Sequence, residues 1–190
     1  MPKKDLQYTL IVSAMLGFFL IPLVKTVPPF NSLSAIVVYS LIILVPLVSL
    51  VGMYVAYMIG KKIAIIWQLA KFALVGVLNT AIDFGILNFF IALTGITSGS
   101  NIIPMNAFAF SGAVVNSYFW NKKSAGFVIF FVVTAIGIAI NSGVLYIVTT
   151  LIPHSIDNTL WANIGKVLAT GLSTVWNFLG YRLIVFKKKD

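Results

Sequence analysis

One acidic residue, Asp83, lies deep inside a hydrophobic run, whereas Asp5, Asp157 and Asp190 lie at an end of the chain or in an expected loop. A carboxylate near the centre of a bilayer costs several kcal/mol unless it is paired or hydrated. Such a residue marks a functional site by default, and the nature of that site depends on the group that pairs with Asp83.

Lys166 is the natural partner because it is expected at the same depth. At 1.5 Å per residue, Asp83 lies about 21 Å beyond the start of its helix, and Lys166 lies about 10 Å below the opposite start of the last helix. In a hydrocarbon core about 30 Å thick these depths nearly coincide. Pairing would remove much of the desolvation penalty of both ions. Two interpretations stay open: the pair only holds the bundle in register, or at least one partner faces a substrate.

Polar side chains continue the faces on which these two charges lie. The last hydrophobic run carries a polar stripe at three- and four-residue spacing: Asn163, Lys166, Thr170, Ser173 and Asn177. On the third run, Gly76, Asn79, Thr80 and Asp83 share a face for the same reason.

The amides and glycines on these runs allow two interpretations. Asn79, Asn141 and Asn177 could form interhelical hydrogen bonds or line a polar groove, and the sequence does not decide between these roles. For the glycines, close helix packing is favoured at Gly76, Gly85 and Gly143.

Three cations could bind a phosphate. We expect these cations near the ends of three helices, on the same side of the membrane: Lys71, Lys122 and Arg182. Arginine offers a planar fork suited to phosphate, and lysine offers a compact point charge. Snorkelling to the membrane interface is the alternative, because it is common for cations at helix ends.

Enzymatic chemistry has little support. The chain has no cysteine and no glutamate, no two carboxylates share an expected helix, and the only histidine, His154, falls in an expected loop. No metal-ligand spacing or phosphate-cradling glycine loop is present. We therefore expect no catalytic residue, no metal and no cofactor, and a protein that is not an enzyme.

The elements that must position these residues are membrane helices. The chain is 60% hydrophobic and only 9% charged, and a membrane-spanning helix needs about 20 mostly apolar residues. Six such runs are present, at residues 7–24, 33–59, 69–94, 102–121, 125–152 and 159–186. Lipid cannot satisfy the edges of an open sheet, so the predicted fold is an all-α polytopic membrane protein.

The distribution of the net charge of +9 indicates how the chain is oriented in the membrane. Nine of the thirteen cations fall on one side of a six-helix threading: Lys3, Lys4, Lys61, Lys62, Lys122, Lys123, Lys187, Lys188 and Lys189. This bias predicts a cell-membrane protein with both termini in the cytoplasm. The basic ends would attract anionic membrane lipids, and no nucleic-acid partner is expected.

The second part of the chain is self-similar. Residues 83–87 match residues 141–145 at an offset of 58, and residues 115–122 match 175–182 at an offset of 60, which also sets Asn106 against Lys166. Each unit holds two helices, which predicts two parallel repeats related by an axis along the membrane normal. We predict an N-terminal two-helix extension, 1–66, and a four-helix domain, 67–190.

The chain resembles the GtrA-like family. Three segments carry the resemblance. The first is Lys71-Phe72 with Gly76, Asn79 and Asp83. The second runs from Asn116 through Asn121 to Lys122, and the third runs from Asn177 to Arg182 and is followed by Val185-Phe186. They stand in the order and at the spacing of the family. The resemblance covers about residues 67–189 and leaves the first two helices outside it.

The resemblance implies a translocase that moves a polyprenyl-phosphate-linked monosaccharide from the cytoplasmic to the outer leaflet for polysaccharide or glycoconjugate synthesis. Arg182, Lys122 and Lys71 would hold the phosphate, and Asn79, Asp83, Asn141 and Lys166 would give the sugar a polar path. Asn116, Asn121 and Asn177 would line its lower part. The alternative is a non-transporting module that anchors or regulates a membrane glycosyltransferase. A glycosyltransferase partner and a homo-oligomer are further expectations.

Overall fold

The structure, a computed structural model, describes residues 1–120 and 127–180, with the side chains of 1–120 and 132–177. These residues form α1 (Lys3–Thr26), α2 (Ala35–Gly60), α3 (Ala64–Thr94), α4 (Ile102–Trp120), α5 (Phe127–Tyr146) and α6 (Asn158–Gly180). A short 3-10 turn, Phe30–Ser32, lies between α1 and α2, and a π-helical turn, Ile147–Leu151, extends α5. The described part of the chain contains no strand, which confirms the all-α prediction.

Four of the described helical segments are long and apolar enough to cross a membrane: Lys3–Thr26, Ala35–Gly60, Ala64–Thr94 and Val132–Leu151. The chain is therefore a multi-pass membrane protein. Six crossings stay a prediction, because α4 and α6 are not among these four segments.

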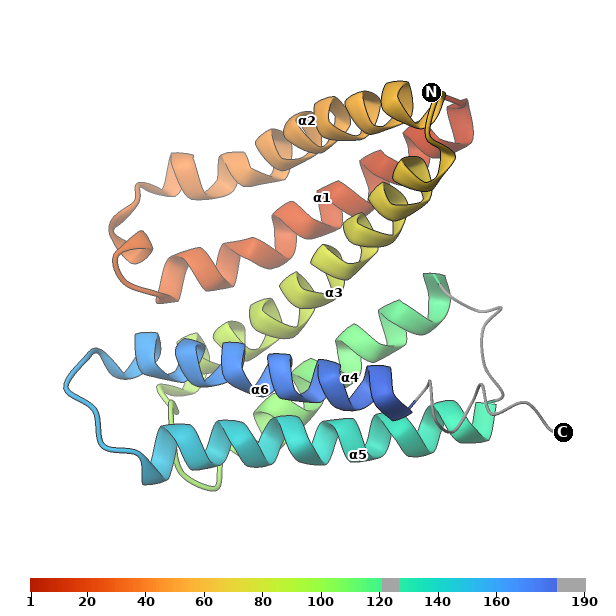
Figure 1. The fold of residues 1–190 in the computed structure, drawn as a ribbon. Helices are drawn as coiled ribbons and strands as arrows, with labels where there is room; N and C mark the ends of the chain where they lie inside the picture. Colours follow the sequence, from red (N-terminus) through yellow and green to blue (C-terminus); the bar gives the residue numbers. More distant parts are fainter. Residues whose placement is uncertain (121–126, 181–190) are drawn as a thin grey trace, which may run out of the picture.

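The helices form two groups joined by α3 (Figure 1). The hairpin of α1 and α2 packs on α3, and the hairpin of α5 and α6 lies on the other side. Helix α4 contacts both α3 and α5. Helix α6 contacts α3 only over a short stretch, and Figure 1 shows the two helices crossing obliquely and diverging away from that crossing.

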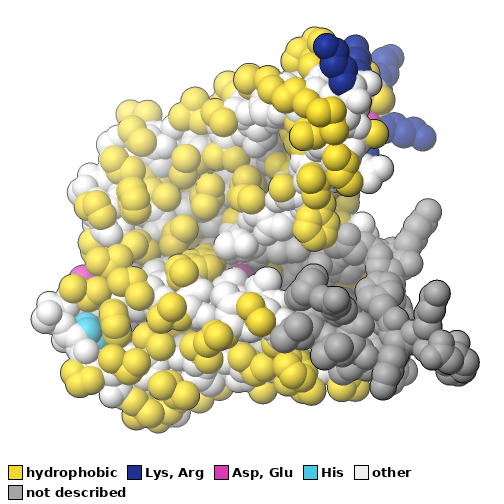
Figure 2. Space-filling view, viewed as in Figure 1, with side chains coloured by type: hydrophobic (Ala, Val, Ile, Leu, Met, Phe, Trp, Pro, Cys, Tyr) yellow, Lys and Arg dark blue, Asp and Glu magenta, His cyan; other side chains and the backbone are white. Residues whose placement is uncertain are grey.

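The outer surface is apolar, as a protein in lipid requires. Ile36 and Val48 of α2 are 83% and 71% exposed, and Phe72 of α3 is 71% exposed. Figure 2 shows hydrophobic side chains over the visible face and Lys side chains gathered at one end. We call this the lysine-rich end; the exposed Lys3, Lys4, Lys61 and Lys62 define it. The loops 27–34, 95–101 and 152–157 form the opposite end.

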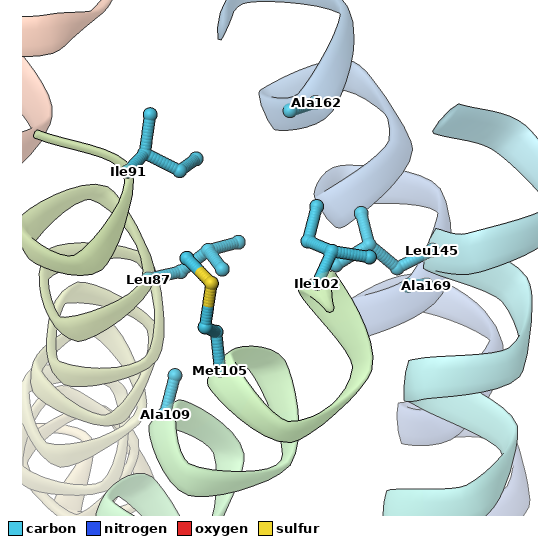
Figure 3. Packing of buried hydrophobic residues seen from close by; sticks show 8 residues of the cluster. All are labelled: Leu87, Ile91, Ile102, Met105, Ala109, Leu145, Ala162 and Ala169. Atoms are coloured by element: carbon cyan, nitrogen blue, oxygen red, sulfur yellow. The ribbon is translucent and has the colours of Figure 1, made fainter. Parts of the chain in front are cut away.

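Two apolar clusters hold the helices together. One joins α3, α4, α5 and α6, and Figure 3 shows Leu87 of α3 and Met105 of α4 pointing toward one another within it. The other packs Val12 of α1 with Leu78 and Ile82 of α3. The first cluster lies on the same four helices as the buried polar residues described below.

The glycines do not all behave as expected. A Cβ at Gly85 would lie 2.2 Å from the carbonyl oxygen of Phe19, so this glycine lets α1 and α3 approach closely. At Gly76 and Gly143 a Cβ would meet no described atom within 4 Å. Close packing is therefore correct for Gly85 and wrong for Gly76 and Gly143, where the helix faces open space.

Candidate functional site

Asp83 and Lys166 form an ion pair in the interior of the bundle. Lys166 Nζ donates to Asp83 Oδ1 at 2.6 Å, and the two side chains are 4% and 0% exposed. The pairing predicted from depth is confirmed. Because removal of one partner would leave the other charge buried and unpaired, each ion depends strongly on the other.

Two asparagines complete the environment of the ammonium. Lys166 Nζ also donates to Asn106 Oδ1 at 2.5 Å and to Asn141 Oδ1 at 3.2 Å. An ammonium has three donors, and here each has an oxygen acceptor. The four side chains come from α3, α4, α5 and α6, one from each helix. We call Asp83, Asn106, Asn141 and Lys166 the polar layer.

Further hydrogen bonds fix the amides of the polar layer. Asn106 Nδ2 donates to Asn141 Oδ1 at 2.8 Å and to Ser142 Oγ at 3.0 Å. Asn141 Nδ2 donates to Ser173 Oγ at 3.1 Å. All of these side chains are buried, so the network runs without a break between α4, α5 and α6. In a low-dielectric interior such connected bonds hold their members in one arrangement.

The polar layer consists of the residues that the sequence offsets relate. Asp83 and Asn141 are matched at an offset of 58, and Asn106 and Lys166 at an offset of 60. Helices related by a two-fold axis would bring matched positions together at that axis, as happens here. The parallel repeat itself stays a prediction.

A second polar contact lies closer to the lysine-rich end. Asn116 Nδ2 of α4 donates to Asn79 Oδ1 of α3 at 2.7 Å, and Trp120 Nε1 donates to Asn116 Oδ1 at 3.1 Å. The Trp120 ring in turn meets the Tyr8 ring edge-on, with centroids 4.9 Å apart. Two predicted substrate residues, Asn79 and Asn116, are thus partners of each other.

A third polar contact joins three helices closer to the opposite end. Asn88 Nδ2 donates to Asn163 Oδ1 at 2.7 Å, and Asn163 Nδ2 donates back to Asn88 Oδ1 at 2.9 Å. The Thr26 hydroxyl of α1 donates to Asn88 Oδ1 at 2.7 Å. We call Thr26, Asn88 and Asn163 the clasp, because they tie α1, α3 and α6 together about one helical turn from the Asp83–Lys166 pair.

The predicted phosphate-binding residues are described only in part. Lys71 Nζ lies 3.8 Å from Asp5 Oδ1, with side chains 38% and 25% exposed, and 5.1 Å from the Trp67 ring centroid. Such a partly exposed pair contributes little to stability and leaves Lys71 able to exchange partners. Lys122 and Arg182 lie outside the described residues, as does Asn121.

Asn177 has an unmatched acceptor. Its buried Oδ1, like the buried Thr170 Oγ1, has no hydrogen-bond partner among the described residues. This oxygen would lie 2.7 Å from a Cβ at Gly137 of α5, so Asn177 faces the α5–α6 contact. Its Oδ1 makes no hydrogen bond to the polar layer, although Asn177 and Lys166 belong to the same stripe predicted on α6.

Sequence reasoning missed Asn88 and Asn106 as site residues. Asn106 had a signal, since the offset of 60 sets it against Lys166. Asn88 had none, because it follows Asp83 by five residues and a helical face repeats at three or four. It meets α6 only because α6 crosses α3 obliquely (Figure 1).

The chemistry available is hydrogen bonding and charge recognition. Within the described residues, no group of three or more His, Asp or Glu side chains could hold a metal ion. His154 lies in the loop after α5 and stacks on Trp161, with ring centroids 5.1 Å apart. The site thus offers one ion pair and several amides, which can accept and donate hydrogen bonds.

The chain matches the model of a known family. The family model described as the GtrA/DPMS transmembrane domain matches residues 71–186. The matched segment includes the whole polar layer and leaves α1 and α2 outside. No curated protein and no solved structure matches the chain.

Proposed function

Because the chain belongs to the GtrA/DPMS transmembrane domain family, we propose that it translocates a polyprenyl-phosphate-linked monosaccharide from one leaflet of the membrane to the other. The family membership supports a role in handling polyprenyl-phosphate sugars. Translocation is the more specific proposal, and the polar layer is the observation that carries it.

The polar layer is suited to a sugar that must cross hydrocarbon. Transferring a hydroxyl out of water without a replacement hydrogen bond costs roughly 1–3 kcal/mol. A monosaccharide carries several hydroxyls, and each can donate and accept as an asparagine amide does. Sugar hydroxyls can therefore replace Asn106 and Asn141 around Lys166 while Asp83 keeps the ammonium neutralised.

Entry of the sugar requires a change in the helix arrangement. Lys166 is fully buried and all three of its donors are used. The sugar therefore exchanges its hydroxyls for existing bonds instead of entering an open channel. Among the described residues, α3 and α6 contact one another only over a short stretch, which holds the Asp83–Lys166 pair and the clasp. This contact is the place where the bundle opens.

The phosphate binds first at the membrane surface, before the sugar reaches the polar layer. Lys71 supplies a partly exposed cation at the lysine-rich end, and Lys122 and Arg182 are proposed to join it there. The excess of lysines predicts that this end is cytoplasmic, with both termini on that side. The sequence carries no ATP-binding motif, so the gradient of lipid-linked sugar drives the flux.

A non-transporting module is the second candidate. The saturated, sealed environment of Lys166 favours it, because a rigid interior is what an anchor for a glycosyltransferase needs. Such a module would tolerate changes in the polar layer and would depend on the exposed surface around Lys61 and Lys62.

Reconstitution separates the two candidates. Purified protein is placed in liposomes with a radiolabelled polyprenyl-phosphate monosaccharide distributed over both leaflets, and an impermeant reagent that modifies the sugar is added outside. A translocase makes nearly all of the label accessible, whereas protein-free liposomes expose only the outer-leaflet share. Accessibility equal to that of protein-free liposomes would exclude translocation and favour the anchoring module.

A further inference from the structure

An apolar groove lies between α1 and α3 on the membrane-facing side of the bundle. It encloses about 580 Å³, and its walls include Leu16, Leu20 and Leu23 of α1 and Gly76, Thr80 and Phe84 of α3. The Thr80 hydroxyl donates to the Gly76 carbonyl at 3.1 Å, so its hydrogen is already used. A groove with this lining accepts hydrocarbon and excludes polar groups.

The groove exists because α3 has small side chains where α1 has leucines. At Gly76 a Cβ would meet no described atom within 4 Å, so no side chain covers the floor at that point. By contrast, α1 lies close to α3 at Gly85, where a Cβ would meet the Phe19 carbonyl. On the face drawn in Figure 2 the surface recedes between the α1–α2 pair and α6.

The groove and the polar layer lie at the same depth. Gly76, Thr80 and Phe84 recur at four-residue spacing over about 12 Å of helix axis. Asn79 and Asp83 fall between them in the sequence and lie on the adjacent face of the same helix. A molecule with one part in the polar layer and another in the groove would need to cross only the width of α3.

A lipid-linked sugar has two such parts, a polar sugar and a hydrocarbon chain. When its sugar occupies the polar layer, its chain must leave the bundle at that depth, because hydrocarbon has no place among buried amides. A bilayer phospholipid keeps its head group at the interface, so nothing ties its chains to this level. We propose that the α1–α3 groove binds the isoprenoid chain of the substrate, an inference that rests on the proposed function. One wall comes from α1, outside the matched residues 71–186, and this gives the N-terminal extension a role.

Photolabelling tests the groove directly. The protein in phosphatidylcholine nanodiscs is irradiated with a polyprenyl phosphate that carries a diazirine in its chain, and labelled peptides are identified by mass spectrometry. We expect labels on residues 16–23 and 73–84, competed by unlabelled polyprenyl phosphate and not by phosphatidylglycerol. Equal labelling by a diazirine phosphatidylglycerol, or equal competition by the unlabelled lipid, would assign the groove to bulk lipid and overturn the proposal.

A matched pair of variants tests whether the labelling depends on open space in the groove. Gly76→Leu places a large side chain in the groove at a position where a Cβ meets nothing within 4 Å. Gly52→Leu makes the same change on α2, where a Cβ also meets nothing within 4 Å and the residue is exposed. Gly76→Leu should reduce labelling at least several-fold, while Gly52→Leu should leave it unchanged. Unchanged labelling in Gly76→Leu contradicts the proposal.

The same preparations separate this inference from the proposed function. If the wild-type protein translocates the substrate but the groove is not labelled, only the proposal that the groove binds the isoprenoid chain is overturned. Specific labelling of the groove without translocation supports the groove and overturns the translocase.

Discussion

At the scale of single residues, the stability of the interior depends on the balance of charge between Asp83 and Lys166. The ammonium has three oxygen acceptors, but only Asp83 neutralises its charge. The amides alone would leave a buried cation, which is costly in hydrocarbon. Charge balance and hydrogen bonding are therefore separate requirements, and substitutions can separate them.

Removing one charge should harm the fold more than removing both. We expect Asp83→Asn and Lys166→Met each to lower stability by about 3–5 kcal/mol, because each leaves an unpaired buried ion. The double variant should recover most of this loss. Thermal unfolding in detergent measures the three variants against wild type, and a double variant less stable than both single ones would contradict the ion-pair account.

The sequence reveals charged residues of the interior more readily than amides. Asp83 and Lys166 stand out because ions are rare in apolar runs, and equal depth then pairs them. Asn88 and Asn163 are ordinary neutral residues, and only the crossing of α3 and α6 brings them together. The partner of an amide depends on helix rotation and crossing, which periodicity does not specify.

At the scale of elements, α1 is held to the matched domain by close packing and the clasp in its C-terminal part and by an aromatic contact near its N-terminal end. Gly85 admits the Phe19 carbonyl, and Thr26 donates to Asn88. Near the lysine-rich end, Tyr8 meets Trp120. The N-terminal hairpin is therefore an integral part of the bundle.

A methyl group at Gly85 should displace α1. Gly85→Ala places a Cβ 2.2 Å from the backbone oxygen of Phe19, which cannot move without the helix. We expect a loss of stability of about 1–3 kcal/mol, the usual cost of overpacking. Gly143→Ala is the matched control, because it meets no atom within 4 Å and should be neutral or stabilising by up to about 1 kcal/mol. Equal melting temperatures for the two variants would show that α1 does not depend on this contact.

Linking the clasp should stop translocation. The chain contains no cysteine, so Asn88→Cys/Asn163→Cys can be joined by a short bis-methanethiosulfonate, each thiol displacing a sulfinate to form a disulfide, without background reaction. If α3 and α6 separate there, the linked protein should lose transport and regain it when a cleavable linker is reduced. Lys25→Cys/Tyr39→Cys, at a hydrogen-bonded pair within the α1–α2 hairpin, should transport normally when linked. Full transport by the linked clasp would place the opening elsewhere.

Helix positions are largely predictable from the sequence, because each apolar run is bounded by charges or turn residues. The first run, predicted at 7–24, is helical over Lys3–Thr26, and the fourth, predicted at 102–121, over Ile102–Trp120. The predicted start of the third run at 69 is late, since α3 begins at Ala64. The π-helical turn at Ile147–Leu151 has no sequence signal, because it is a local change of hydrogen-bond register within an apolar run.

At the scale of the whole molecule, the distribution of lysines predicts which end faces the cytoplasm. Lys4→Cys and Lys62→Cys should be protected from an impermeant thiol reagent in intact cells, whereas Ser155→Cys should react. Permeabilised cells serve as the control, in which all three variants react. Labelling of Lys62→Cys in intact cells would reverse the orientation and with it the direction of the proposed transport.

On the proposed function, the polar layer carries the sugar through the bundle. To test this role, the rate at which a labelled polyprenyl-phosphate monosaccharide crosses the bilayer of proteoliposomes is measured for wild type and for Asp83→Leu/Lys166→Met. Thermal unfolding first confirms that the charge-free variant is folded. We predict rapid exchange with the wild type and a rate at the protein-free level with the variant. A wild-type rate in the folded variant would contradict the claim and leave the polar layer a structural element only.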